Sequence, residues 1–141
     1  MLTQEQCNFY SENGYLLVEG QFMAEEARDF RQEAHALIDR LTQHADINPT
    51  WGSAKQLAEG TKLLHCHNVQ FYSAIFTRLL VDERLTGAVA DLIGSPNVQL
   101  HHNKLFIKPP EKGSPFPMHQ DYPYFPHERH SMLAAVIHFD D

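Results

Sequence analysis

Apolar side chains at helical spacing dominate the first two thirds of the chain. Between Ala24 and Gln43 they recur at steps of three and four residues, which predicts a long amphipathic helix with one buried stripe. Thr3 and Gln6 occupy the positions of a capping box at the start of another helix, and Gly14 is placed to end it. The pattern predicts helices over three further stretches: residues 4–13, 71–80 and 82–93.

The spacing changes after Pro96. Apolar and polar residues alternate over residues 97–108, which predicts a strand, and a run rich in proline and glycine at 109–115 ends it. Further strands are predicted over residues 116–122 and 133–139. Earlier in the chain, residues 15–18 read as a brief strand, 61–70 as extended and 45–60 as a loop or lid.

These elements predict a single α+β domain over residues 1–141. Residues 1–96 are mainly helical, and residues 97–141 begin the core of an antiparallel jelly roll, also called a double-stranded β-helix. A jelly roll has eight strands, whereas the pattern supplies three after Pro96. An open roll leaves unpaired strand edges. We therefore expect the roll to be truncated in this sequence.

Charge and cysteine content narrow the possible partners. The formal net charge is −7, which argues against nucleic acid or an anionic membrane surface as a partner. No apolar run approaches the length of a membrane span, and no signal segment is evident. Cys7 and Cys66 do not form a disulfide framework, and we interpret both as reduced thiols of a cytoplasmic protein. No feature specifies an oligomeric state.

The strongest chemical signal is the pair His119 and Asp121. Two residues separated by one position on a strand point to the same side, about 6–7 Å apart along the backbone. An imidazole and a carboxylate in this arrangement supply two of the three ligands in a 2-His-1-carboxylate iron site. Iron suits the pair better than structural zinc, which prefers four N and S ligands. Tyr122–Phe125 then form an aromatic wall beside the pair.

The chain has ten histidines, and a second group of them is a candidate metal site. His65 and His67 flank Cys66 and project from one strand face, an arrangement that can hold zinc or iron. With no second Cys/His pair at zinc spacing, we interpret them as surface or pocket-lining histidines. Cys66 is a possible nucleophile, but nothing near it in sequence lowers the thiol pKa.

Two segments together resemble a known family. Residues 106–113 read FIKPPEKG and residues 117–126 read PMHQDYPYFP. These runs resemble the phytanoyl-CoA dioxygenase family, whose members are Fe(II)- and 2-oxoglutarate-dependent oxygenases with a double-stranded β-helix core. Weaker likeness extends through residues 91–98 and 9–18. The resemblance covers nearly the whole chain, but only the N-terminal half of the family's domain.

The resemblance implies roles for four residues. His119 and Asp121 match the first two iron ligands. Gln120 matches a residue beside the cosubstrate, and Lys62 matches a lysine that contacts 2-oxoglutarate in the best-known members. Lys104 departs from the pattern, because relatives carry an apolar residue near the cosubstrate there. A second departure is Val136 or Ile137, where relatives carry Trp.

The family's distal iron-binding histidine and its 2-oxoglutarate-clamping arginine are expected beyond residue 141. Arg129 lies too close to the motif to replace that arginine. His138 is a candidate substitute for the third ligand, but it is expected to pair locally within its own strand and not to face the iron.

The resemblance therefore implies an Fe(II)- and 2-oxoglutarate-dependent dioxygenase that hydroxylates a small organic substrate, with part of the active site absent from this sequence. One alternative is a catalytically inactive truncated chain, or a binding module that retains a two-ligand metal site. Another is a cupin-like metal isomerase, which has the same ligands but needs no 2-oxoglutarate.

Overall fold

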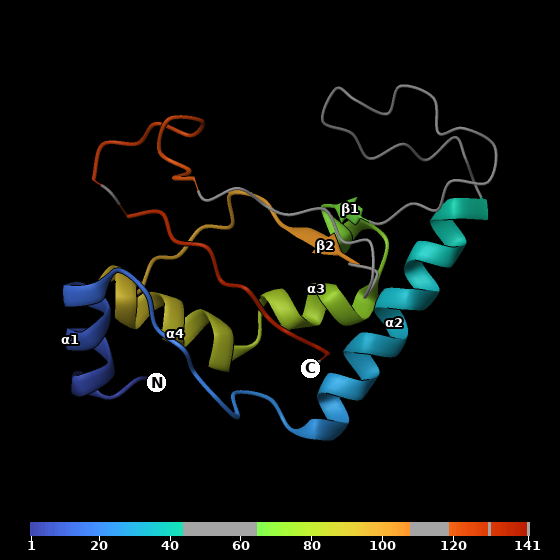
Figure 1. The fold of residues 1–141 in the computed structure, drawn as a ribbon, viewed down its shortest axis with the longest axis horizontal. Coiled ribbons are helices and arrows are strands. Elements are labelled where there is room, and N and C mark those ends of the chain that lie inside the picture. Colours follow the sequence, from blue (N-terminus) through green and yellow to red (C-terminus); the bar gives the residue numbers. More distant parts are fainter. Residues whose placement is uncertain (44–64, 108–118, 130, 141) are drawn as a thin grey trace.

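The computed structural model describes residues 1–43, 65–107, 119–129 and 131–140 (Figure 1). Within them, four α-helices, one 3₁₀ turn and two short strands follow one another along the chain. In order these are α1 (Gln4–Asn13), α2 (Ala24–Gln43), β1 (His65–His67), η1 (Val69–Phe71), α3 (Ala74–Leu80), α4 (Glu83–Ile93) and β2 (Lys104–Phe106).

The two N-terminal helices form where the sequence predicts them. At the start of α1, the Thr3 hydroxyl accepts from the Gln6 N–H and the Gln6 side chain accepts from the Thr3 N–H, so the capping box is confirmed. Gly14 ends the helix with a φ of 77°, a left-handed conformation that glycine adopts without steric cost. Helix α2 has the predicted bounds, with acidic Glu25 and Glu26 in its first turn.

Of the next two helices, α3 begins later than predicted, whereas α4 has the predicted bounds to within one residue. The helix predicted over 71–80 begins only at Ala74, because the Ser73 hydroxyl accepts from the Phe76 N–H and caps it there. The residues just before form the 3₁₀ turn η1. Helix α4 lies within the predicted 82–93, with Asp82 as its N-cap and Gly94 as its left-handed C-cap.

The strand predictions hold only in part. β1 and β2 pair antiparallel, with His65 opposite Phe106, Cys66 opposite Leu105 and His67 opposite Lys104. Of the strand predicted over 97–108, the structure assigns only β2. A strand ladder needs a hydrogen-bonding neighbour along its length. Residues 97–103 have no such neighbouring strand among the described residues, which accounts for the short β2.

Three other predicted strands are wrong in the part of the chain that the structure describes. Residues 15–18, 119–122 and 133–139 contain no assigned strand. The paired β1 and β2 are the whole of the sheet structure found in the described ranges, so alternation alone did not produce a ladder. The extended prediction over 61–70 is right at β1. Residues 61–64 and 116–118 and the loop predicted over 45–60 lie outside the described residues.

The core lies between α2, α3 and the inner face of the β1–β2 ribbon. Its centre is the α2 stripe at positions i, i+3, i+4 and i+7, in which Leu37 is only 1% exposed. Cys66 of β1 and Leu105 of β2 close the core from the ribbon side, because paired residues on adjacent strands share a face. The buried apolar members are Ala34, Leu37, Ile38, Leu41, Cys66, Val69, Phe76, Leu79 and Leu105.

The C-terminal segment completes this core without being a strand. Figure 1 shows it (red) running past α3 toward α2. The Phe139 ring packs between Phe30 of α2 and Phe76 of α3, with ring centroids 5.3 Å and 6.1 Å away. Asp140 forms an ion pair with Arg31. The chain end is therefore tied to the helices through aromatic packing.

The described residues form a mixture of helices and a small sheet, in agreement with the predicted α+β class. Among these residues, no helix has both the length and the apolar character needed to cross a membrane.

Candidate metal centre

His119 and Asp121 lie side by side at the start of a turn. His119 Nε2 is 3.4 Å from Asp121 Oδ1, and the two side chains are 40% and 41% exposed. The Asp121 carbonyl accepts hydrogen bonds from the N–H groups of Tyr124 (2.9 Å) and Phe125 (3.0 Å). The backbone folds back directly after the carboxylate, so the pair sits on a hydrogen-bonded turn and not on the predicted strand.

The turn is anchored on the extended segment before β2. The Phe125 ring packs against His101 and His102, with ring centroids 4.8 Å and 5.1 Å away. Within the turn, His127 Nδ1 lies 2.8 Å from the Phe125 carbonyl oxygen, and its ring is 5.2 Å from Tyr122. This aromatic and imidazole packing joins segments that are distant along the chain, so no local sequence pattern predicts it.

The donor atoms of the pair fit one metal ion. A bound ion sits about 2.0–2.1 Å from an imidazole nitrogen and about 2.0–2.2 Å from a carboxylate oxygen in protein zinc sites. Donors 3.4 Å apart are therefore close enough for a single cation to contact both. As a simple ion pair this exposed contact contributes little to stability, since solvent screens it. The proximity and the donor chemistry make the pair a candidate metal centre.

In the part of the chain that the structure describes, no group of three or more His, Cys, Asp or Glu residues is placed to hold a metal. Within the described ranges, His138 is not placed in such a group with His119 and Asp121. Gln120 lies between them and is exposed. Lys62 lies outside the described residues, so its role remains a prediction. Arg129 is exposed at the end of the turn.

The His65-Cys66-His67 segment forms β1, and its three side chains alternate across the ribbon. Cys66 is fully buried, and this burial raises its thiol pKa to about 11. A thiol held protonated in this way is a poor nucleophile, so the structure disfavours the nucleophilic interpretation of Cys66. His65 and His67 face the other side of the ribbon and, among described residues, form no three-ligand metal group.

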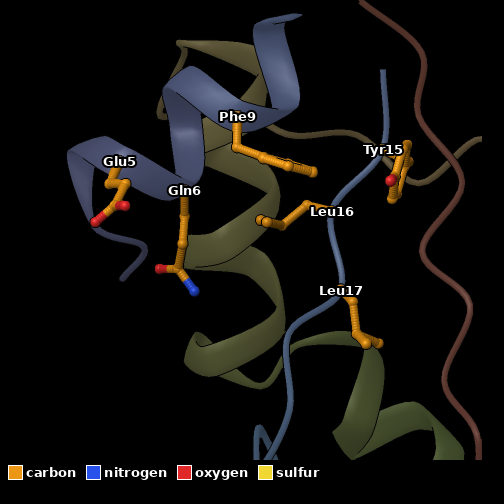
Figure 2. Close-up of a pocket in the computed structure, with 6 residues that line it drawn as sticks. All are labelled: Glu5, Gln6, Phe9, Tyr15, Leu16 and Leu17. Carbon is orange, nitrogen blue, oxygen red and sulfur yellow. The ribbon is translucent and has the colours of Figure 1, made fainter. Parts of the chain in front are cut away.

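A hollow of about 310 Å³ lies at α1, away from this centre. Figure 2 shows it between α1 and the chain that follows: the Phe9 ring extends from the helix toward Leu16, and Tyr15 and Leu17 lie along the neighbouring segment. None of its lining residues belongs to the turn that carries His119 and Asp121 (residues 119–125), which we call the motif turn. The chemistry of the candidate centre therefore does not coincide with this hollow.

An imidazole and a carboxylate are two of the three donors that mononuclear non-haem iron oxygenases use. The chain belongs to one dioxygenase family: the family model described as phytanoyl-CoA dioxygenase (PhyH) matches residues 10–141. The resemblance carried by residues 106–113 and 117–126 is thereby confirmed. No solved structure matches the chain.

Several curated proteins are similar along most of the chain. It is 30% identical over 138 residues to a probable alpha-ketoglutarate-dependent hypophosphite dioxygenase of Stutzerimonas stutzeri, covering 97% of this chain and 48% of that protein. It is 29% identical to the peroxisomal phytanoyl-CoA dioxygenase of Homo sapiens, covering 96% and 42%. It is 28% identical to the ectoine dioxygenase of Bordetella bronchiseptica, covering 86% and 37%. The chain thus spans less than half the length of each of these relatives.

Proposed function

We propose that this chain carries the first two iron ligands of an Fe(II)- and 2-oxoglutarate-dependent dioxygenase that hydroxylates a small organic substrate. The observation that carries the proposal is the 3.4 Å approach of His119 Nε2 to Asp121 Oδ1 within a family-matched segment. The relatives' names support the reaction class, since each is a dioxygenase and one is described as dependent on alpha-ketoglutarate.

In the proposed mechanism, His119 Nε2 and the Asp121 carboxylate hold the metal. Iron held there would supply the oxidative chemistry of the family, in which 2-oxoglutarate and O₂ are converted to succinate and CO₂ and the substrate gains a hydroxyl group. The turn fixes the backbone at Asp121, because its carbonyl accepts hydrogen bonds from two backbone N–H groups. Gln120 and Lys62 are proposed to contact the cosubstrate. Tyr124 places an aromatic ring beside the pair, with its centroid 6.3 Å from that of His119.

The substrate is proposed from the family and not from a pocket. The relatives are named for hypophosphite, ectoine and phytanoyl-CoA, which differ widely in size and charge. This range leaves substrate choice to residues that differ among members. We propose a small organic molecule, the class to which ectoine belongs.

The test measures metal binding and turnover separately on the full chain. Anaerobic titration with Fe(II) is expected to show binding that Asp121→Ala and His119→Ala each weaken strongly, because a two-ligand site loses its chelation with either partner. Asp39→Ala and His35→Ala are the matched controls, since both residues are exposed on α2, and they should bind as the unmodified chain does. Unchanged Fe(II) affinity in Asp121→Ala would reject the site.

Turnover then separates the proposal from its alternatives. Succinate formed from 2-oxoglutarate in an iron-dependent way, and lost in Asp121→Ala, supports the dioxygenase. Fe(II) binding without succinate formation supports the binding module, in which the two-ligand site persists without catalysis. Iron-dependent conversion of a substrate without 2-oxoglutarate supports the isomerase.

A further inference from the structure

The outer face of the β1–β2 ribbon gathers three groups that can carry positive charge. In an antiparallel pair, residues directly opposite one another project to the same side. The register places His67 opposite Lys104 and His65 opposite Phe106, so these four side chains share the face that points away from Cys66 and the core. The His65 and His67 rings lie 5.8 Å apart. We call these four residues the ribbon face.

The ribbon face has an apolar wall as well as cationic groups. Lys104 Nζ lies 4.3 Å from the centroid of the Phe106 ring, a cation–π contact. Phe106 is still 47% exposed and His65 is exposed, so a ligand can reach both from solvent. Lys104 and His67 are half-buried. The face therefore offers charge and ring surface side by side.

The electrostatics of the ribbon face are unfavourable when no anion is bound. Burial lowers the pKa of Lys104, and burial followed by the Lys104 charge lowers the pKa of His65 and of His67. His102, in the segment before β2, adds to the repulsion at His67. Within the described ranges, no Asp or Glu forms an ion pair with Lys104, His65 or His67.

The ribbon face is also distinct from the candidate metal pair. Among described residues neither His65 nor His67 joins His119 and Asp121 in a metal-binding group. The motif turn instead packs on His101 and His102, which lead directly into β2. The face is thus joined to the motif turn through the 97–103 segment, which leads into β2 (Figure 1).

We propose that the ribbon face binds the oxyanion, a carboxylate or phosphate, of an organic substrate, with Lys104 as the cationic donor and Phe106 against the attached carbon skeleton. His65 and His67 donate further hydrogen bonds to the anion, and its charge favours their protonation. The occupant is the substrate, because the exposed Phe106 ring beside the charge offers a surface to a carbon skeleton, whereas the cosubstrate is proposed to contact Gln120 and Lys62. This identity rests on the proposed function, whereas binding of the oxyanion does not require turnover.

Phenyl phosphate is the probe, used with the full chain in the absence of metal. Its addition is expected to move the imidazole resonances of His65 and His67 in nuclear magnetic resonance spectra and to raise both pKa values. The comparison is made at a fixed pH of about 7.5, because a phosphate monoester itself gains a proton at about pH 6. Phenol, which lacks the anion, should produce neither change. Histidine resonances that stay in place at saturating phenyl phosphate overturn the proposal.

Charge variants make the test specific. Lys104→Met keeps a long apolar side chain and should weaken phenyl phosphate binding about tenfold, the loss of one charge-assisted hydrogen bond. Lys104→Arg should restore most of the affinity. Arg28→Gln is the matched control, since it removes one exposed positive charge on α2 and should change nothing. Equal weakening by Arg28→Gln and Lys104→Met would mean unspecific attraction and would overturn the site.

A second arm identifies the source of the anion. Because 2-oxoglutarate also carries carboxylates, the two ligands are compared by affinity. If the ribbon face serves the substrate, 2-oxoglutarate should displace phenyl phosphate only when it is in large excess. Displacement at concentrations below that of phenyl phosphate assigns the face to the cosubstrate and overturns the proposal. Both arms are read without iron. Failure of the dioxygenase assay together with intact phenyl phosphate binding would therefore reject the proposed reaction and leave the ribbon face standing.

Discussion

The His101 ring lies edge-on to the Phe125 ring, with centroids 4.8 Å apart and planes at 63°. This contact ties the turn that carries His119 and Asp121 to the segment that leads into β2. Phe125 N–H also donates to the Asp121 carbonyl, so the same residue is packed on one side and hydrogen-bonded on the other. Phe125 is therefore placed to hold the orientation of the pair without touching a metal.

Replacing Phe125 with Ala is expected to weaken Fe(II) binding by about tenfold, the lower end of the range for residues that orient ligands from behind. The reason is lost preorganisation, since the turn then moves independently of His101 and His102. Anaerobic Fe(II) titration measures the effect. Phe71→Ala is the matched control, because Phe71 is 76% exposed and lies in η1. Equal Fe(II) affinity in Phe125→Ala and the unmodified chain would contradict this positioning role.

The helices could be predicted because their signals are local. The apolar stripe of α2 and the capping box of α1 each lie within one element, and both are confirmed. Helix α3 begins later than predicted because the Ser73 side chain accepts a hydrogen bond from the helix and caps it at that point. Strands are different, because a ladder depends on a partner elsewhere in the chain. The alternation over 97–108 therefore overstated β2.

The sequence predicted which residues make up the candidate site, but it did not predict the backbone structure that brings them together. Alternation suggested that His119 and Asp121 share a side, and the structure brings them together through a turn instead. The packing of Phe125 on His101 and His102 joins distant segments, so no sequence pattern predicted it. Lys104 stood out in sequence only as a departure from the family. The strand register shows that Lys104 lies directly opposite His67 on the adjacent strand.

Leu37 is expected to be the most costly apolar residue of α2 to truncate. It is 1% exposed at the centre of the core between α2, α3 and the ribbon. Leu37→Ala should lower the free energy of unfolding by about 2–5 kcal/mol, through lost transfer free energy and the cavity that remains. Urea unfolding followed by circular dichroism measures this. Leu17→Ala, at a residue that is 70% exposed, should fall within about 0.5 kcal/mol of the unmodified chain.

Cys66 is expected to resist alkylation in the folded protein. Its side chain is fully buried and its pKa is raised to about 11, so the thiolate is scarce at pH 8. Iodoacetamide labelling followed by peptide mass spectrometry should show Cys66 modified only after denaturation, whereas the half-buried Cys7 of α1 reacts earlier. Labelling of Cys66 at the same rate in folded and urea-unfolded protein would mean that β1 does not cover it.

The Glu26–Arg84 ion pair is expected to make stability depend on acid pH. Arg84 donates to both Glu26 oxygens, at 2.9 Å and 2.7 Å, and the Met23 N–H also donates to this carboxylate. These contacts lower the Glu26 pKa from 4.5 to about 2. The folded state therefore holds Glu26 ionised where the unfolded chain protonates it. The resulting stabilisation is complete above about pH 4.5 and is lost as the pH falls toward 2.

Glu26→Gln should remove this part of the acid dependence, so its thermal midpoint should fall less steeply between pH 4.5 and 2 than that of the unmodified chain. Glu25→Gln is the matched control, because Glu25 is exposed one residue earlier in the same first turn and forms no ion pair among the described residues. Thermal unfolding followed by circular dichroism at several pH values gives both slopes. Identical slopes for Glu26→Gln and Glu25→Gln would show that Arg84 does not single out Glu26. A shallower slope for Glu26→Gln alone would tie the first turn of α2 to α4 through this one pair.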